Sequence, residues 1–152
     1  MLSKKPVEKI QVNELCRLAQ INKSTFYRHY LDIYDLFSSL ESELFEKIVA
    51  DFEFSDMLFS NPEKFLQGLI FTLTPYREQI LLLFDGRIQN FAERTEKWLS
   101  SIYLNKNSTQ KEKITFSFIV GGAVHAFLCP DFHLNDVTDT IVSIMNKLGD
   151  SK

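Results

Sequence analysis

The 152-residue chain contains little glycine, proline or cysteine, and each shortage excludes a class of protein. Five Gly and four Pro favour packed helices over a loop-rich or all-β fold. The two cysteines, Cys16 and Cys129, lie far apart in apolar helical patterns, so we expect reduced core thiols in a cytoplasmic protein rather than a disulfide. The sequence has neither a secretory signal nor an apolar run of the ~20 residues that a membrane-spanning helix needs.

The sequence also lacks the motifs of common enzyme classes. It contains no glycine-rich phosphate loop, no HExxH and no nucleophile elbow. The three histidines, His29, His125 and His133, belong to different predicted elements, and neither cysteine has a partner at metal-ligand spacing. We therefore expect a protein that is not an enzyme and that needs no metal or other cofactor.

What the chain has in quantity is phenylalanine, with 14 residues, and hydrophobic residues in general, at 45%. This content is sufficient for a core of packed helices, and we expect an all-α fold. The formal charge of −3 is unevenly distributed. Residues 1–30 hold six Lys and Arg against two Asp and Glu, which gives +4, whereas residues 31–152 hold 11 against 18, which gives −7. A basic N-terminal part on an acidic body suits a protein that presents one end to phosphates.

Residues 11–30 have the pattern of two short helices with a tight turn between them. The first helix places four apolar side chains on one face, at i, i+3, i+4 and i+7: Val12, Leu15, Cys16 and Ala19. The residues Gln20, Ile21 and Asn22 then break the run, and we expect the Asn22 side chain to cap the second helix. In that helix, residues 23–29, Phe26 faces the core. This pattern is typical of a helix-turn-helix whose second helix enters the DNA major groove.

The segment NKSTFYRHY resembles the motif of the tetracycline-repressor (TetR) family, which is roughly V-S-x-G-T-L-Y-x-H-F. The matching residues are Ile21, Thr25, Phe26, Tyr27, His29 and Tyr30. The preceding EKIQVNELCRLA is similar to the family's lead-in, K-I-T-V-x-x-I-A. The resemblance is specific over about residues 8–36 and architectural beyond them. It implies an all-α homodimer in which a helix-turn-helix on double-stranded DNA is followed by a helical domain that binds an effector and dimerises.

The resemblance also implies which residues contact DNA. We assign Lys23, Ser24 and Arg28, at the exposed start and outer face of the second helix, to base edges. The positions of Thr25, Tyr27 and His29 usually contact phosphate in the family. Two features differ from the family pattern: the first helix is truncated to the few residues before Pro6, and Ile33 stands where a phosphate-binding Lys is usual. They favour an alternative, a protein-interaction module of the same fold that has lost operator binding.

The remaining chain is predicted to be a connector and a helical body. Asp32 is expected to cap a connector helix over residues 33–52, on which Leu36, Leu40, Leu44 and Ile48 form one apolar stripe.

After a loop over residues 54–61, Pro62 is expected to begin the first of five helices, Pro75 to end it, and Gly86 to end the second. The five helices cover residues 63–74, 76–84, 88–104, 109–128 and 136–148, and Ile102 lies on the predicted inner side of the third.

We therefore divide the chain into residues 1–50, the DNA-binding domain with its connector, and residues 51–152. The last two helices have two interpretations, a core within one subunit or half of a four-helix dimer interface. Because helix 109–128 is apolar almost all round, we expect it to form a dimer interface with helix 136–148. Gly121 and Gly122, in its middle, predict close approach of another helix.

The aromatic residues of the body allow two interpretations. At helical spacing such residues usually form a core, but the family encloses an effector pocket among its middle helices, and such pockets are mostly apolar with a few polar groups. If a pocket exists here, it would hold a small apolar or aromatic molecule. Its lining would come from Phe65, Leu69, Tyr76, Phe84, Phe91, Trp98 and His125.

Overall fold

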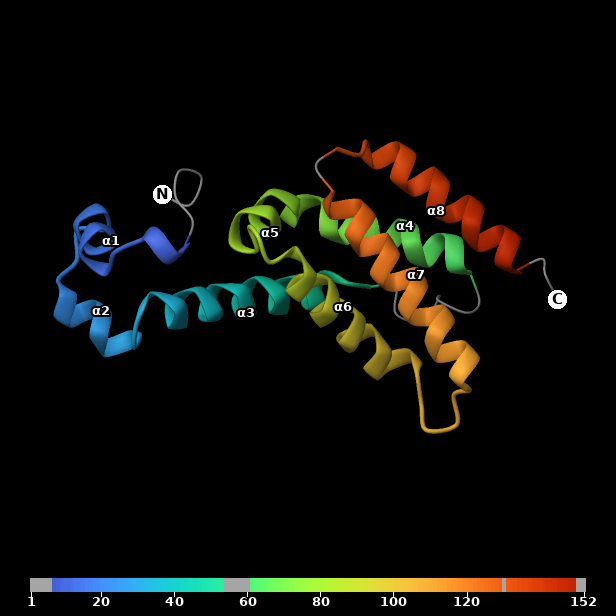
Figure 1. Ribbon diagram of the computed structural model, residues 1–152, viewed down its shortest axis with the longest axis horizontal. Helices are drawn as coiled ribbons and strands as arrows, with labels where there is room; N and C mark the ends of the chain where they lie inside the picture. Colours follow the sequence, from blue (N-terminus) through green and yellow to red (C-terminus); the bar gives the residue numbers. More distant parts are fainter. Residues whose placement is uncertain (1–6, 54–60, 130, 150–152) are drawn as a thin grey trace.

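A small group of helices at the N-terminus is joined to a larger helical body by one long helix in the computed structural model (Figure 1). The structure describes residues 7–53, 61–129 and 131–149. No strand occurs among them, so the predicted all-α class is confirmed. The truncated first helix expected before Pro6, and most of the loop expected before Pro62, lie outside the described residues.

The N-terminal head consists of a short 3-10 helix, η2 (Val7–Lys9), followed by α1 (Val12–Leu18) and α2 (Lys23–His29). The bounds of α2 are those predicted from the sequence, residues 23–29. On α1, Cys16 is buried and Val12 and Leu15 are half-buried, but Ala19 is exposed because the helix has already ended there. The predicted four-residue apolar face is therefore one residue too long.

The connector α3 (Ile33–Asp51) begins as predicted, because the Asp32 carboxylate accepts a hydrogen bond from the Asp35 amide at 2.9 Å. Its first turns bury Ile33 and Phe37 in a head cluster with Val7 and Ile10. Its last turns bury Leu44, Phe45 and Ile48 in the core of the body. Leu40, predicted as part of one continuous stripe, is exposed because it lies between the two clusters.

The body starts with α4 (Pro62–Leu73), which has Pro62 in its first turn and the Asn61 side chain accepting from the Lys64 amide at 3.0 Å. Pro75 was predicted to stop this helix. It lies instead within a 3-10 helix, η4 (Thr74–Tyr76), that leads directly into α5 (Arg77–Leu83). The α5 helix is followed by a turn in which Gly86 adopts a φ of 69°, as expected for its predicted role as a stop.

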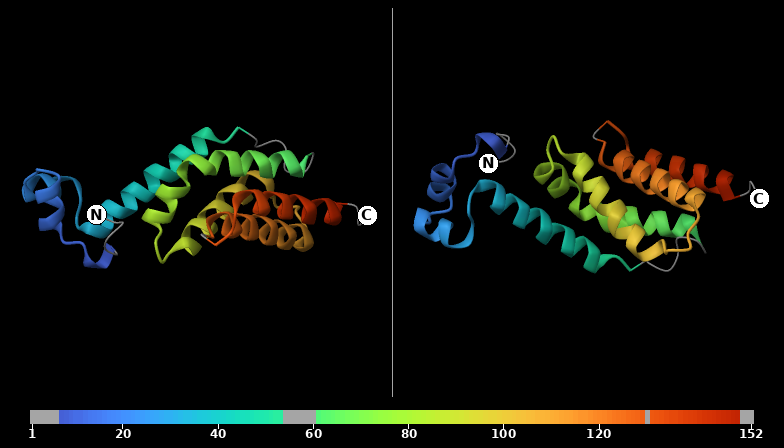
Figure 2. Two further views of the ribbon diagram at one scale, coloured as in Figure 1. Left: turned by 90° about the horizontal axis from the view of Figure 1, so that it is seen from above. Right: turned by 60° about the horizontal axis from the view of Figure 1, so that its bottom comes forward.

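Three longer helices complete the body: α6 (Ile88–Tyr103), α7 (Gln110–Leu128) and α8 (Leu134–Gly149). The α6 helix packs against α7, and α4 packs against α8 (Figures 1 and 2). On α6 the buried stripe follows Phe91, Thr95 and Leu99, so Ile102 falls at its edge and is exposed, contrary to the prediction. The Thr95 hydroxyl donates to the Phe91 carbonyl at 2.9 Å, which satisfies the one polar group of this stripe.

Neither glycine of α7 lies against the backbone of another helix among the described residues. A Cβ added at Gly122 would meet no atom within 4 Å, and one at Gly121 would meet only the carboxylate of Glu96, on α6, at 3.6 Å. In the described part of the subunit, the predicted close approach is therefore limited to this one side chain. The glycines leave a shallow, uncovered position in the middle of a helix whose interior stripe, Phe116, Val120, Ala123, Val124, Phe127 and Leu128, is already buried.

Candidate nucleic-acid interface

The turn between α1 and α2 is held by backbone hydrogen bonds across a residue in the left-handed region. Gln20 has a φ of 56°. The Ile21 amide donates to the Cys16 carbonyl at 3.0 Å, and the Gln20 amide donates to the Arg17 carbonyl at 3.4 Å. This pairing is the Schellman motif, which satisfies the last carbonyls of α1 and redirects the chain into α2.

Replacing Gln20 with glycine is expected to stabilise the head by about 1 kcal/mol, because glycine adopts the left-handed conformation without the steric penalty that a Cβ carries. The replacement should leave the direction of α2 unchanged, since the two hydrogen bonds come from the backbone. Thermal unfolding of Gln20→Gly beside Gln20→Ala tests this. A glycine variant that melts below the alanine variant would contradict the argument.

The α2 helix is anchored by Phe26, whose side chain is 3% exposed. The rings of Tyr27 and Tyr30 lie 5.4 and 5.6 Å from its ring centroid. Asn22 occupies the predicted N-cap position, but its side chain makes no capping bond, because the whole residue is exposed and water competes for the helix amides. The first turn is held instead by the Asn22 carbonyl, which accepts from Thr25 and Phe26 at 3.0 and 3.2 Å.

Five of the six predicted DNA-binding side chains are exposed on α2: Lys23, Ser24, Tyr27, Arg28 and His29. Thr25 is half-buried, which suits a side chain that contacts the backbone of DNA rather than its bases. The structure thus brings all six predicted residues together on one seven-residue helix with a single inward anchor. Two basic groups and an imidazole on this surface favour a polyanionic partner.

Two further exposed residues flank α2 and were not predicted as part of the interface. Leu31 is 83% exposed and Tyr34, in the first turn of α3, is 55% exposed. The Leu31 amide donates to the Asp35 carboxylate at 2.8 Å, and the Asp35 amide donates to Asp32, so the junction between α2 and α3 is fixed by paired carboxylate caps. A sequence pattern could have indicated Tyr34, because it lies opposite the buried Ile33 and Phe37 stripe.

Ile33 is 8% exposed and belongs to the head cluster with Val7, Ile10 and Phe37. Leu83 of α5 packs against the same cluster and also against the core of the body. The position at which the related motif usually carries a phosphate-binding Lys is therefore used in this chain to attach α3 to the head. Any phosphate contact near the start of α3 must come from other side chains, of which Tyr34 is exposed.

Six of the seven side chains predicted to line an effector pocket lie in or against one core cluster. Phe65, Leu69, Phe84 and Phe91 are almost completely buried, and Tyr76 and Trp98 are half-buried against them. Their rings contact one another edge-on, with the centroids of Phe84 and Phe91 5.2 Å apart. His125 is exposed on α7 and is not brought to this cluster. Three surface hollows in the described part of the chain, between α6 and α7, beside α8 and at the turn before α7, are lined by none of these seven residues.

Within the described ranges, no His, Cys, Asp and Glu side chains gather into a group that could hold a metal ion. The thiols of Cys16, which is buried, and Cys129, which is half-buried, are both free. No helix in the described part of the chain has the length and apolar character needed to cross a bilayer. Comparison of the chain with models of protein families, with curated proteins and with solved structures gave no match in any of the three.

Proposed function

We propose that this chain is a TetR-like DNA-binding transcriptional regulator that acts as a homodimer on a palindromic operator. The observation that carries the proposal is α2, a short helix that buries only Phe26 fully and exposes Lys23, Tyr27, Arg28 and their neighbours at one end of the molecule (Figure 1). A helix held in this way by a Schellman turn can enter the major groove with its outward side chains facing base edges.

The two kinds of DNA contact are proposed to be divided along α2. Lys23, Ser24 and Arg28 would contact base edges, and Thr25, Tyr27 and His29 would contact phosphates. An exposed guanidinium forms two parallel hydrogen bonds with guanine, whereas a phenol on a phosphate oxygen is insensitive to sequence.

Arg28→Ala is expected to lower discrimination at one base pair by about 1–3 kcal/mol, because a bidentate base contact is lost. Tyr27→Phe should weaken binding to all sequences about equally, because it removes one phosphate contact and keeps the ring. Binding of both variants to a panel of single-base operator variants measures the difference. If the two variants shift the panel in the same way, the proposed division of contacts is wrong.

The proposed homodimer uses the outer faces of α7 and α8. Ile114 and Phe118 on α7 are 60% and 75% exposed, and Ile144 on α8 is 45% exposed. Together with the uncovered Gly122, they form an apolar face on helices that already bury another face inside the subunit. Apolar side chains of this size are usually covered in a working assembly, and a two-fold axis brings the same face of two copies together.

Regulation is proposed to pass from the body to the head through α3. The Glu41 carboxylate of α3 lies 2.9 Å from the Arg87 guanidinium, and the Arg94 guanidinium lies over the Phe45 ring at 4.5 Å. The Tyr76 hydroxyl donates to Asp51 at the end of α3, and this hydrogen bond raises the Tyr76 pKa. An effector that binds two body conformations with different affinity would therefore also shift the tilt of α3.

The second candidate is the interaction module without operator binding, which the buried Ile33 favours because it removes one expected phosphate contact. A mobility-shift titration against the DNA upstream of the chain's own gene separates the two. The regulator binds this DNA at least about a thousandfold more tightly than scrambled DNA of the same length. Equal, salt-sensitive binding to both DNAs would contradict the proposed function.

A further inference from the structure

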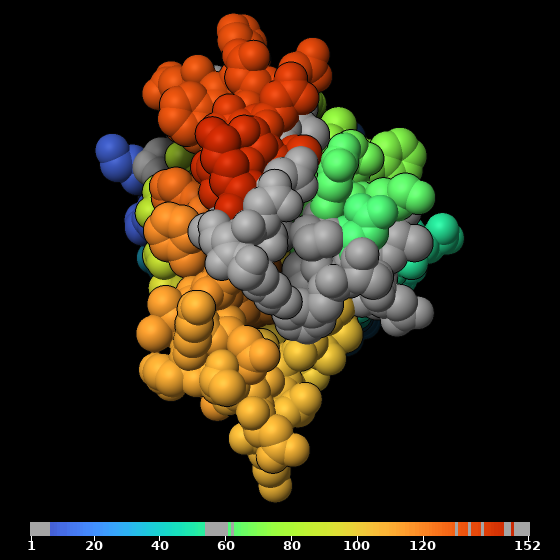
Figure 3. All heavy atoms as spheres, turned by 90° about the vertical axis from the view of Figure 1, so that its right-hand side faces the viewer, coloured from blue at the N-terminus to red at the C-terminus, as the bar shows by residue number. Residues whose placement is uncertain are grey.

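The described structure has a groove between the C-terminal half of α6 and the N-terminal half of α7, with a volume of about 610 Å³. It lies next to the turn that joins these helices, which protrudes at the end of the body away from the head (Figure 3). None of its residues belongs to the predicted effector lining. It is lined on the α6 side by Glu96, Ser100 and Leu104, and on α7 by Lys113, Ile114, Phe116, Ser117 and Phe118.

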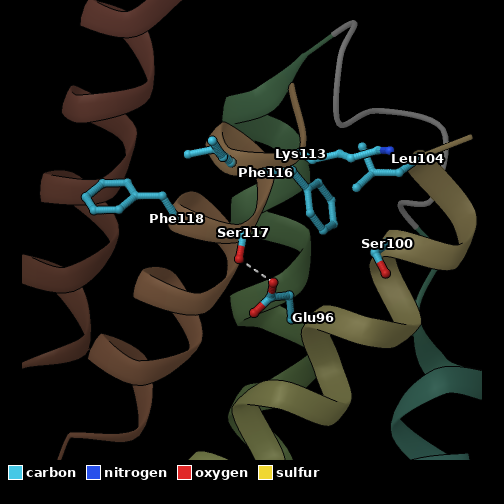
Figure 4. A pocket seen from close by; sticks show the side chains of 8 residues that line it. Glu96, Ser100, Leu104, Lys113, Phe116, Ser117 and Phe118 are labelled. Carbon is cyan, nitrogen blue, oxygen red and sulfur yellow. Dashed lines mark hydrogen bonds between the residues drawn. The ribbon is translucent and has the colours of Figure 1, made fainter. Parts of the chain in front are cut away.

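The polar groups of this groove are separated by an aromatic floor. At one end, the Ser117 hydroxyl donates to the Glu96 carboxylate (Figure 4). The other oxygen of this carboxylate would lie 3.6 Å from a Cβ added at Gly121. At the other end, the Lys113 ammonium lies beside Leu104 (Figure 4). The Phe116 ring lies between the two ends (Figure 4). On the α6 side, the Ser100 hydroxyl donates to the Lys97 carbonyl and keeps free acceptor capacity.

The groove adjoins the proposed dimer face, because Ile114 and Phe118 of that face are also among its lining residues. The Phe118 side chain points away from Glu96 and Ser117, so the polar end of the groove lies on the side away from this ring (Figure 4). The interior floor is firm, because Phe116 is 5% exposed and its ring lies 6.4 Å from the ring of Tyr103. A ligand could therefore bind to the groove without displacing the core.

We infer that this groove binds a small zwitterion with an apolar middle, whose ammonium pairs with Glu96 and whose anionic group pairs with Lys113. The half-buried Glu96 carboxylate fixes the cationic end, because Ser117 already holds its orientation. The apolar middle of the ligand packs against Phe116 and Leu104. Ligand pockets are typically of this kind, mostly apolar with a few polar groups at defined points.

Binding at this groove can reach the connector, because α6 contributes to both. Trp98, between Glu96 and Ser100 in sequence, places its ring 6.1 Å from Phe45 and 5.4 Å from Phe52. Arg94 lies over the Phe45 ring one turn earlier. An effect of this ligand on DNA binding through α3 rests on the proposed function. Binding of the ligand to the groove is measured without DNA, so the ligand-binding inference and the proposed function can fail separately.

Isothermal titration calorimetry on the full chain tests the inference with straight-chain ω-amino acids of six, eight and twelve carbons as probes. Octylamine and octanoate serve as singly charged comparisons. At least one ω-amino acid should bind saturably and more tightly than either comparison. Glu96→Gln should weaken octylamine about fivefold, and Lys113→Gln should weaken octanoate about fivefold, as expected for partly exposed ion pairs.

Matched controls come from charges on the same helices that do not line the groove. Glu93→Gln and Lys111→Gln remove exposed charges of the same sign and should leave all affinities unchanged. Ser100→Trp should abolish binding by filling the groove, and unchanged thermal midpoints show that each variant is folded. The inference is overturned if no probe gives saturable heat, or if the groove variants and the control variants bind alike.

Discussion

Phe26→Ala is expected to abolish specific DNA binding, because the side chain is the single fully buried anchor of α2. Removing a buried phenylalanine costs about 3–5 kcal/mol, which is comparable with the whole stability of a small helical unit. The core of the body has its own cluster and does not include Phe26. The variant should therefore keep most of its helical circular dichroism while losing the head.

Tyr27→Ala is the matched control on the same helix, since Tyr27 is 56% exposed and adjoins Phe26. It should weaken DNA binding with little change in the unfolding of the head. Hydrogen exchange of the α1 and α2 amides reports the stability of the head directly. If Phe26→Ala leaves these amides protected, or leaves specific DNA binding intact, the anchoring role is wrong.

Gly122→Leu is expected to weaken the proposed homodimer without unfolding the subunit. Within the described part of the subunit, a Cβ at Gly122 meets no atom within 4 Å, and leucine is a better helix former than glycine by about 1 kcal/mol. The substitution is therefore expected to keep the subunit fold. Across a two-fold interface the added side chain occurs twice, so overpacking of about 1 kcal/mol per copy weakens the dimer roughly thirtyfold.

Sedimentation velocity over a dilution series that starts at micromolar concentration measures this difference. The wild-type chain should be a dimer at micromolar concentration, and the dissociation constant of Gly122→Leu should be about thirtyfold higher at unchanged helical content. Lys97→Leu adds the same side chain to an exposed site on α6 and should keep the wild-type dissociation constant. A wild-type chain that is monomeric at micromolar concentration, or equal dissociation constants for Gly122→Leu and Lys97→Leu, would rule out the proposed interface.

Local patterns predicted much of the fold. The bounds of α2, the Asp32 cap, Pro62 at the start of α4 and the burial of Phe26 all depend on residues within about one turn of one another. Caps and apolar spacing can be predicted from the sequence because they depend on neighbouring residues and not on contacts with distant parts of the chain. The six residues predicted to contact DNA were found on one helix for the same reason.

The failures of prediction occurred where distant parts of the chain decide the outcome. Leu40 is exposed because the head cluster covers the start of α3, the body core covers its end, and Leu40 lies between them. The sequence of α3 does not show where the head ends and the body begins. The groove at Glu96 and Ser117 depends on how α6 crosses α7, which helical periodicity does not specify. Pro75 was predicted to end a helix. Whether a proline ends a helix depends on the backbone of the next turn, and here that turn continues as η4.

The central claim, that two copies of α2 read one operator, is tested most directly by footprinting on the DNA upstream of the gene. We predict two protected half-sites with centres about 10 base pairs, ~34–36 Å, apart, because the recognition helices of a dimer must enter successive major grooves on one side of the duplex. Protection should disappear with Arg28→Ala at concentrations that saturate the wild-type chain. Uniform protection along the DNA, or none from a folded dimer, would contradict the claim.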